Sequence, residues 1–330
     1  MAAGLPRPGR RAVAGAPGDP VDRRHDHDGR GGARVTDLSD ETTRRLVRAG
    51  LDPSYVLDVV RRALDEDLDG GVDVTSIATV PFDQESSADL VARGDGVVAG
   101  LPVAAAVFEV ATDDAVEVTW KVEDGAAVRA GDLLMSLTAA TRGLLTGERT
   151  ALNLLCRLSG VATLTRRWVD AVSGTGAAVR DTRKTTPGLR ALEKYAVRCG
   201  GGVNHRMSLS DAAMVKDNHV VAAGGVAEAF RAVRAAFPDV PVEVEGDSVE
   251  DVVAAVEAGA DLVLLDNMTV EDMRRAVSVV AGRARLEASG GLRLDNAHDV
   301  AATGVDFLAV GALTHSAPVL DIACDLRLVS

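Results

Sequence analysis

Short apolar runs recur along the second half of the chain, and each run ends in charged residues or in glycine. They read AAVRDTRK, AAMVKDNH, VEVEGDS, LVLLDN, RLEASGG and LAVGAL, and they end near Thr182, Val215, Val244, Leu265, Ala288 and Val310. Their ends lie roughly 20 to 33 residues apart, which is the spacing of βα units. Amphipathic segments over 226–237, 248–259 and 269–280 separate the later runs. This alternation predicts an incomplete (β/α)6 barrel with parallel strands.

The first half of the chain has a different pattern. Apolar residues have helical spacing between Leu38 and about Leu68, and again from Thr146 to Val172. Between these helical segments, short alternating runs separated by glycine turns predict strands. We therefore expect an α/β sandwich domain over 37–157, the barrel over 158–316, and a C-terminal helix over 317–330 that packs back on the sandwich. Residues 1–36 lack apolar periodicity and predict a disordered tail.

Composition narrows the class of protein. The chain has 330 residues and a formal net charge of −13, which argues against a nucleic-acid-binding surface. No apolar run approaches the roughly 18 residues that cross a bilayer, so we expect no membrane contact. Three cysteines without metal-ligand spacing indicate neither a disulfide framework nor a zinc site, and they favour a cytoplasmic location. The charge is locally reversed between Arg180 and His219, which suggests a pocket for a small polyanion.

Candidate functional residues follow the predicted strands. Strand C-termini lie on one face of a parallel barrel, and that face carries the active site. One pocket is therefore expected to be surrounded by Arg183, Lys184, Lys216, Glu245, Asp266 and Gly290.

The cationic candidates suit an anionic ligand. Arg183 offers a planar fork and Lys184 a compact charge, as carboxylate or phosphate binding requires. His205 and Arg206 follow a triple glycine that permits close approach of backbone to a ligand. Lys216 comes directly after a predicted strand. The alternatives are solvated charges for the first pair, an ordinary loop for the second, and a structural ion pair for Lys216.

The acidic and glycine-rich candidates suggest a sugar phosphate. Glu245 and Asp266 end consecutive strands, where they could act as general acid and base, bind a hard cation and sugar hydroxyls, or pair with the cations. The surrounding cations favour a sugar-bound magnesium ion. We expect Glu243 to be out of register and to face the helices. A phosphate site or ordinary α/β turns are the two interpretations of Ser289, Gly290, Gly291 and Gly311.

Several segments together resemble the quinolinate phosphoribosyltransferase family over about residues 40–330. They are GERTALNLLCRLSGVAT, DTRKTTPGLRALEKYAVRCGGGVNHRMSLSDAAMVKDNH, EVE, LLDN, EASGG and AVGALTHS. The resemblance implies an α/β sandwich beside an incomplete barrel. It also implies the Mg2+-dependent conversion of quinolinate and phosphoribosyl pyrophosphate (PRPP) into nicotinate mononucleotide, pyrophosphate and CO2, a step of NAD biosynthesis.

The resemblance also implies roles for individual residues. The catalytic residues would be Lys184, Lys216, Glu245 and Asp266. The quinolinate carboxylates would be held by Arg183, His205, Arg206 and Lys216, with Lys184 between quinolinate and PRPP, and Thr182 would also bind substrate. Glu245 and Asp266 would bind ribose and Mg2+, and Ser289, Gly290, Gly291 and Gly311 would bind the 5′-phosphate. Arg149 would enter the active site of a neighbouring subunit, which implies a homodimer.

Two other functions compete with this one. A paralogue on the same scaffold, such as a molybdenum-transport-associated homologue, would act on a different anionic substrate. The series DTRK, NHR and MVKDNH favours quinolinate, because a diacid calls for several cations. A non-catalytic ligand-binding or sensor protein would not need the pair Glu245 and Asp266.

Overall fold

A computed structural model describes residues 38–112 and 116–329, so the expected tail over 1–36 lies outside the described residues. The first half contains the helices α1 (Asp40–Arg48), α2 (Pro53–Leu68), α3 (Val74–Thr79), α4 (Leu101–Ala111) and α5 (Thr141–Ala171). Its strands are β1 (Glu85–Ala92), β2 (Gly96–Val97), β3 (Glu117–Trp120), β4 (Ala127–Val128) and β5 (Leu133–Ala140).

The second half alternates strands with helices. Its strands are β6 (Ala178–Arg180), β7 (Ala213–Val215), β8 (Val242–Gly246), β9 (Leu262–Asp266), β10 (Arg285–Ser289), β11 (Phe307–Ala309) and β12 (Ile322–Leu328). Its helices are α6 (Arg190–Cys199), α7 (Asp217–Ala223), α8 (Val226–Ala236), α9 (Val249–Glu257), α10 (Val270–Val280), α11 (Ala297–Ala301) and α12 (Ala312–His315).

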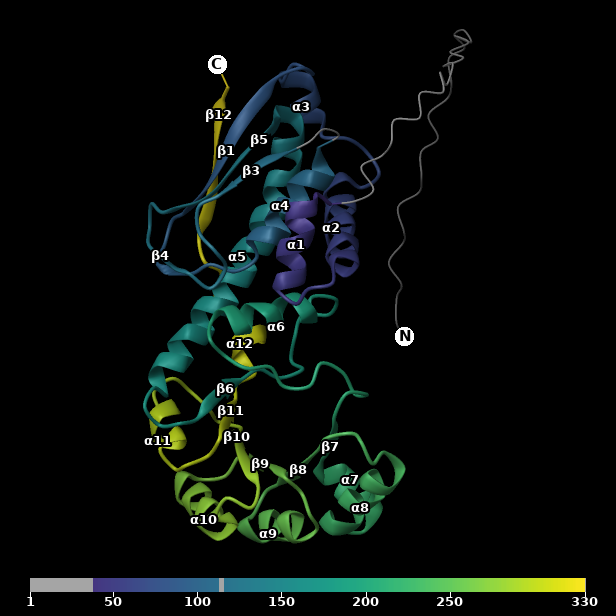
Figure 1. Cartoon of the computed structure of the whole chain (residues 1–330), viewed down its shortest axis with the longest axis vertical. Coiled ribbons are helices and arrows are strands. Elements are labelled where there is room, and N and C mark those ends of the chain that lie inside the picture. Colours follow the sequence, from purple (N-terminus) through teal and green to yellow (C-terminus); the bar gives the residue numbers. More distant parts are fainter. Residues whose placement is uncertain (1–37, 113–115, 330) are drawn as a thin grey trace, which may run out of the picture. The chain divides into compact units, whose positions relative to one another are not determined.

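A four-stranded antiparallel sheet and its helices form the predicted sandwich. The strand order is β12-β1-β5-β3, and α5 packs on β1, β5 and β12 while α4 packs on α5 (Figure 1). The predicted domain boundary at 157/158 falls inside α5, which is 31 residues long. Because α5 also contacts β6 and α6, one helix belongs to both the sandwich and the barrel.

Two expectations for this region are wrong. The segment 322–328 is not a helix: β12 pairs antiparallel with β1, from Ala92 opposite Ile322 to Ser86 opposite Leu328. It does pack back on the sandwich, but as an edge strand, because pairing with a free sheet edge overrides a weak local preference. Helices α3 and α4 both lie in the expected strand region. The reason is clearest for α4. Its run LPVAAAVFEVA is almost entirely buried, and such a run has no periodicity that separates helix from strand.

Six parallel strands form the predicted barrel, in the order β6-β11-β10-β9-β8-β7. The described strands β6 and β7 are the two edges of this sheet and do not pair, so the barrel is incomplete. Val203 extends the β6 edge through a parallel bridge to Arg180. The loop that follows Val203 therefore passes close to the C-terminal end of β6, where His205 and Arg206 can reach the barrel mouth.

Strand register places the chemistry in two layers. Side chains two residues apart point to the same face of a strand. On β8, Glu243 and Glu245 therefore share a face, and on β10, Glu287 and Ser289 do so. Glu245 and Glu287 both pair with Leu264 of the intervening β9. Glu287 is thus level with Glu245, and Glu243 lies one inward-facing position deeper. Glu243 and Glu287 are both buried, whereas Glu245 is not, and we call these two buried carboxylates the deeper layer.

Candidate active site

A cavity of about 560 Å3 opens at the C-terminal ends of the barrel strands. Every predicted site residue except Arg149 lines it, namely Thr182, Arg183, Lys184, His205, Arg206, Lys216, Glu245, Asp266, Ser289, Gly290, Gly291 and Gly311. Arg149 lies on α5 and is exposed. The structure thus brings the strand-end residues together in one cavity and leaves Arg149 outside it.

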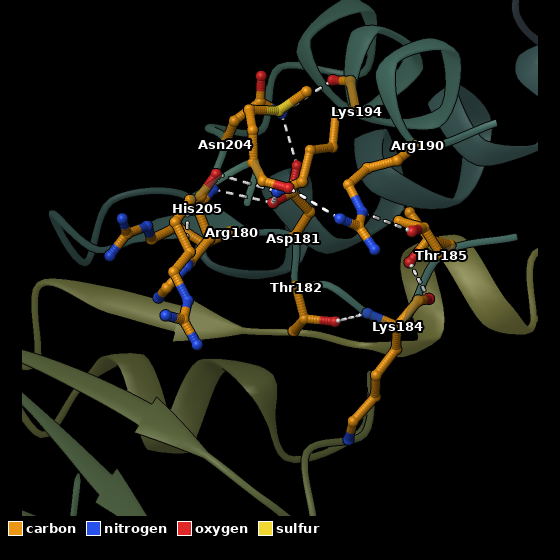
Figure 2. Close-up of polar contacts among 12 residues, drawn as sticks. Arg180, Asp181, Thr182, Lys184, Thr185, Arg190, Lys194, Asn204 and His205 are labelled. Atoms are coloured by element: carbon orange, nitrogen blue, oxygen red, sulfur yellow. Dashed lines mark hydrogen bonds and ion pairs between the residues drawn. The ribbon is translucent and has the colours of Figure 1, made fainter. Parts of the chain in front are cut away.

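Asp181 organises the cationic side of this cavity from beneath. Its fully buried carboxylate pairs with the ammonium of Lys194 on α6 and accepts hydrogen bonds from the Asn204 side chain at 2.5 Å and from the His205 N–H at 2.8 Å (Figure 2). Lys194 also donates to the His205 carbonyl at 2.9 Å. Burial lowers the pKa of Lys194, and the charge of Asp181 opposes that shift. These contacts fix the loop that carries His205 and Arg206 against the end of β6.

Arg183 and Arg206 carry positive charge that the described residues do not fully compensate. The Nε of Arg183 is buried and has no hydrogen-bond partner. Arg206 donates to the Ala212 carbonyl at 2.8 Å. Burial lowers the pKa of Arg206, and the nearby charge of Arg183 lowers it further. Two like charges that raise each other's energy are stabilised by an anion placed between them.

Lys184 and the glycines form a separate part of the cavity. The Lys184 side chain extends away from the Asp181 cluster (Figure 2). A Cβ on Gly311 would lie 2.9 Å from Lys184 Cδ and 3.3 Å from His315, so these two side chains pack directly against the Gly311 backbone. Gly290 has φ +83°, and a Cβ there would lie 2.1 Å from the Asn267 Oδ1. Backbone without side chains next to a lysine is a suitable environment for a phosphate group.

Glu245 and Asp266 lie at the mouth on neighbouring strands. The ammonium of Lys216 pairs with the Glu245 carboxylate, and Asp266 accepts a hydrogen bond from the Asn267 side chain at 2.9 Å. Two carboxylates on adjacent strand ends are the hard oxygen ligands that Mg2+ prefers when substrate phosphates supply the rest. The donor set therefore fits a substrate-bound magnesium ion.

The deeper layer contains groups that the sequence analysis missed or misplaced. Glu243 was expected to face the helices, which is wrong: it points inward like Glu245, because the two are two residues apart on one strand. Its Oε2 lies 2.6 Å from Nε2 of His205, whose Nδ1 accepts the Arg206 N–H at 2.7 Å. Both ring nitrogens of His205 are therefore engaged by the protein.

Glu287 is the other residue of this layer. Its side chain is fully buried, lines the cavity and pairs with Arg180. Burial raises the pKa of Glu287 to about 8, with a further increase from Glu243 that the charge of Arg180 only partly offsets. His205, Glu243 and Glu287 bring potential metal-ligand atoms within 4.8 Å of one another.

Some of the missed residues had a detectable signal. Glu243 and Glu287 each precede a recognised inward-facing residue by two positions, so strand alternation alone could have found them. His315 also lines the cavity, three residues beyond Ala312 in the segment AVGALTHS. Asp181 and Lys194 carry no local signal, because their pairing depends on how α6 folds against the end of β6.

Cations, carboxylates and side-chain-free glycines at the C-terminal face of a parallel barrel define an enzyme site for anionic, phosphorylated substrates. Family models agree with this class. Residues 73–159 match the quinolinate phosphoribosyl transferase N-terminal domain, and residues 161–325 match the C-terminal domain. The chain belongs to the quinolinate phosphoribosyltransferase family.

Individual relatives are similar over most of their length. The nicotinate-nucleotide pyrophosphorylase (carboxylating) of Mycobacterium leprae is 55% identical over 273 residues, which cover 82% of this chain and 96% of that protein. A probable enzyme of the same name from Bacillus subtilis is 40% identical, over 80% of this chain and 90% of its own. The crystal structure of NadC from Streptococcus pyogenes superposes with a TM-score of 0.82 at 39% identity, covering 85% of this chain and 99% of that one. These matches confirm the predicted fold class.

Proposed function

We propose that the protein transfers the phosphoribosyl group of PRPP to quinolinate and releases CO2, forming nicotinate mononucleotide and pyrophosphate for NAD biosynthesis. One observation carries the proposal: a single cavity offers uncompensated cations for a diacid and, separately, carboxylates and glycines for a phosphorylated sugar. The names of the relatives above describe the same reaction.

The residues suit this chemistry. The pyridine nitrogen of quinolinate has a free lone pair, so its attack on C1′ of ribose requires no strong base. The reaction requires instead that a dianion align with a donor that also carries several negative charges. Arg183, Arg206 and Lys216 would hold the carboxylates in positions fixed before the reaction, and alignment of this kind is worth roughly 7 to 11 kcal/mol of barrier. His205 would contribute by orienting Arg206, since both its ring nitrogens are engaged.

Glu245 and Asp266 would hold the Mg2+ ion that PRPP brings into the site. When bound, the ion would supply positive charge to the departing pyrophosphate. Because Lys216 pairs with Glu245, this carboxylate must be shared between the lysine and the PRPP end of the site. Removing the ion with a chelator should abolish turnover, and Asp266→Asn should raise the Mg2+ concentration needed for half-maximal rate. Unchanged magnesium dependence in that variant would contradict the assignment.

A homodimer would complete the site. Arg149 is exposed on α5 and does not line the cavity of its own chain. An arginine from a second copy would add the remaining cation for a diacid. Separately, we propose that the enzyme is located in the cytoplasm. Within the described residues, no helix is long and apolar enough to cross a membrane. Mixing Arg149→Ala with Lys184→Ala protein tests the dimer: shared sites restore part of the activity, whereas independent sites restore none.

The decisive experiment is turnover of the purified full chain with quinolinate, PRPP and Mg2+. Nicotinate mononucleotide, pyrophosphate and CO2 should form in equal amounts. A parallel reaction replaces quinolinate with nicotinate, which has only one carboxylate. Product from nicotinate but not from quinolinate would overturn the substrate assignment and favour a paralogous transferase.

A further inference from the structure

Two buried glutamates beneath the cation-rich side of the cavity have oxygens without partners. Among the described residues, Glu243 Oε1 and Glu287 Oε1 are fully enclosed and accept no hydrogen bond. The other oxygen of Glu243 contacts Nε2 of His205 at 2.6 Å, and Nε2 lies 3.9 Å from Glu287 Oε1. Unpartnered carboxylate oxygens inside a protein are costly, so their protonation state requires an explanation.

The surroundings of Glu287 favour its neutral form. Charged and titratable groups face it from β6 (Arg180), from the loop after β6 (Asp181), from β8 (Glu243) and from the loop after α6 (His205). The neighbouring strands place Leu264 and Phe307 beside it, and neither is charged. Two nearby acids and complete burial outweigh one arginine, and the pKa of Glu287 accordingly rises to about 8. A pKa near 8 favours the protonated form of this carboxyl group at neutral pH.

The proposed reaction requires a proton donor next to the bound diacid. The inference rests on the function proposed above, in which C2 of the pyridine ring loses its carboxylate. When the C2–carboxylate bond breaks, CO2 leaves and the bonding electron pair stays on C2, next to the cationic ring nitrogen. That carbon must then gain one proton to become the C2–H of nicotinate mononucleotide. The donor has to lie where the diacid binds, near Arg183 and Arg206.

The other acids of the cavity are poorly placed for this step. Lys184 and His315 pack against Gly311, on the side of the cavity assigned to phosphate. Lys216 would hold a carboxylate of the diacid and must stay an ammonium to do so, and the Nε2 proton of His205 is donated to Glu243. Glu287 is the remaining group: the residue lines the same cavity, and its enclosed Oε1 accepts no hydrogen bond from the described residues.

We propose that Glu287 is the acid that protonates C2 after CO2 has left. The carboxyl O–H bond of Glu287 breaks, its proton forms the C2–H bond, and Glu287 is left as a carboxylate beside Arg180. Solvent returns the proton when product leaves. Glu243 acts as a positioning residue: it accepts the hydrogen bond from Nε2 of His205, so this imidazole does not donate its proton to C2. The same geometry, run in reverse, lets the Glu287 carboxylate remove the C2 proton from bound product.

Reversibility supplies a direct test. The full-length enzyme is incubated with nicotinate mononucleotide in D2O, and exchange of the C2 hydrogen is followed by proton NMR. Glu287→Gln keeps the size and the contact with Arg180 but cannot donate or accept the proton. Loss of general acid–base catalysis predicts that exchange and forward turnover fall at least about 100-fold in this variant. Binding of nicotinate mononucleotide, measured by calorimetry, should change less than about threefold, since the charge at neutral pH is the same.

A matched control is Glu109→Gln. Glu109 is also buried, on α4 far along the chain from the barrel, where it accepts hydrogen bonds from Ser39 and Thr42. This variant should exchange the C2 hydrogen at the wild-type rate. A rate in Glu287→Gln equal to that of the control would overturn the proposal. So would a divalent ion held tightly by His205, Glu243 and Glu287 in the purified enzyme, because a coordinated carboxylate has no proton to give.

The outcome can be separated from that of the proposed function. Exchange uses only the product and needs neither PRPP nor quinolinate. If the wild type forms nicotinate mononucleotide but Glu287→Gln keeps full exchange, only the role of Glu287 is wrong. If the wild type forms none from quinolinate and PRPP, the function itself is wrong.

Discussion

The ammonium of Lys216, just after β7, pairs with the carboxylate of Glu245 on β8. The two residues have opposite assignments, since Lys216 would hold a quinolinate carboxylate and Glu245 would bind the ribose and magnesium. Each therefore competes with the ligand of the other. The two residues neutralise each other before substrates bind, and the pair must loosen when they do.

This competition predicts opposite effects for one substitution. Glu245→Gln removes the competing charge, so quinolinate should bind about two- to fivefold more tightly in the absence of PRPP, as expected for a partly exposed ion pair. Turnover with PRPP should fall, because a carboxylate that would accept hydrogen bonds from ribose and bind magnesium is lost. Calorimetry and steady-state kinetics measure the two effects. Asp247→Asn removes an exposed charge two residues away and is the control; weaker quinolinate binding in Glu245→Gln would contradict the pairing argument.

The like charges of Arg183 and Arg206 predict a trade between stability and binding. Arg183→Ala removes a buried group whose Nε lacks a partner, so the ligand-free protein should be slightly more stable to thermal unfolding. Quinolinate binding should weaken by about 2 to 5 kcal/mol, the usual cost of losing a buried charged contact. Arg183→Lys should recover only part of the affinity, because an ammonium cannot form the planar two-point contact. A less stable ligand-free variant would show that Arg183 has a structural role.

The buried pair of Asp181 and Lys194 predicts a large structural effect. Lys194→Met leaves an uncompensated carboxylate in the interior, which should lower the free energy of unfolding by about 3 to 5 kcal/mol. Combining it with Asp181→Asn removes that charge, so the double variant should be more stable than Lys194→Met alone. Urea unfolding of the wild type, both single variants and the double variant gives the coupling energy. Additive effects would mean that the two side chains do not interact.

Sequence periodicity located the barrel because its strands and helices carry local signals. The segments 226–237, 248–259 and 269–280 contain the helices α8, α9 and α10. Strand-end chemistry could be predicted because a parallel barrel sends all its strand ends to one face. The elements that were wrong, α4 and β12, are decided by burial on all sides and by a partner strand far away in the sequence, which no local pattern contains.

The deeper layer of the site shows the same limit. Strand alternation could have placed Glu243 and Glu287 inward. It could not have shown that Glu243 contacts His205 and that Glu287 pairs with Arg180, because these partners come from other segments. The pKa of Glu287 depends on that assembled environment. Only the folded arrangement distinguishes a carboxylate from a carboxylic acid at this position.

The raised pKa of Glu287 predicts how stability changes with pH. In the unfolded chain a glutamate titrates near 4.3, whereas in the folded protein the pKa is about 8. Between these values the folded state binds a proton that the unfolded state has lost, so stability falls as pH rises through this window and levels off above it. Glu287→Gln has no such proton. The difference in free energy of unfolding, variant minus wild type, should therefore grow in favour of the variant from about pH 4.5 to pH 8. Urea unfolding at four or five pH values measures it, and a difference that stays constant across the window would mean that Glu287 is ionised throughout.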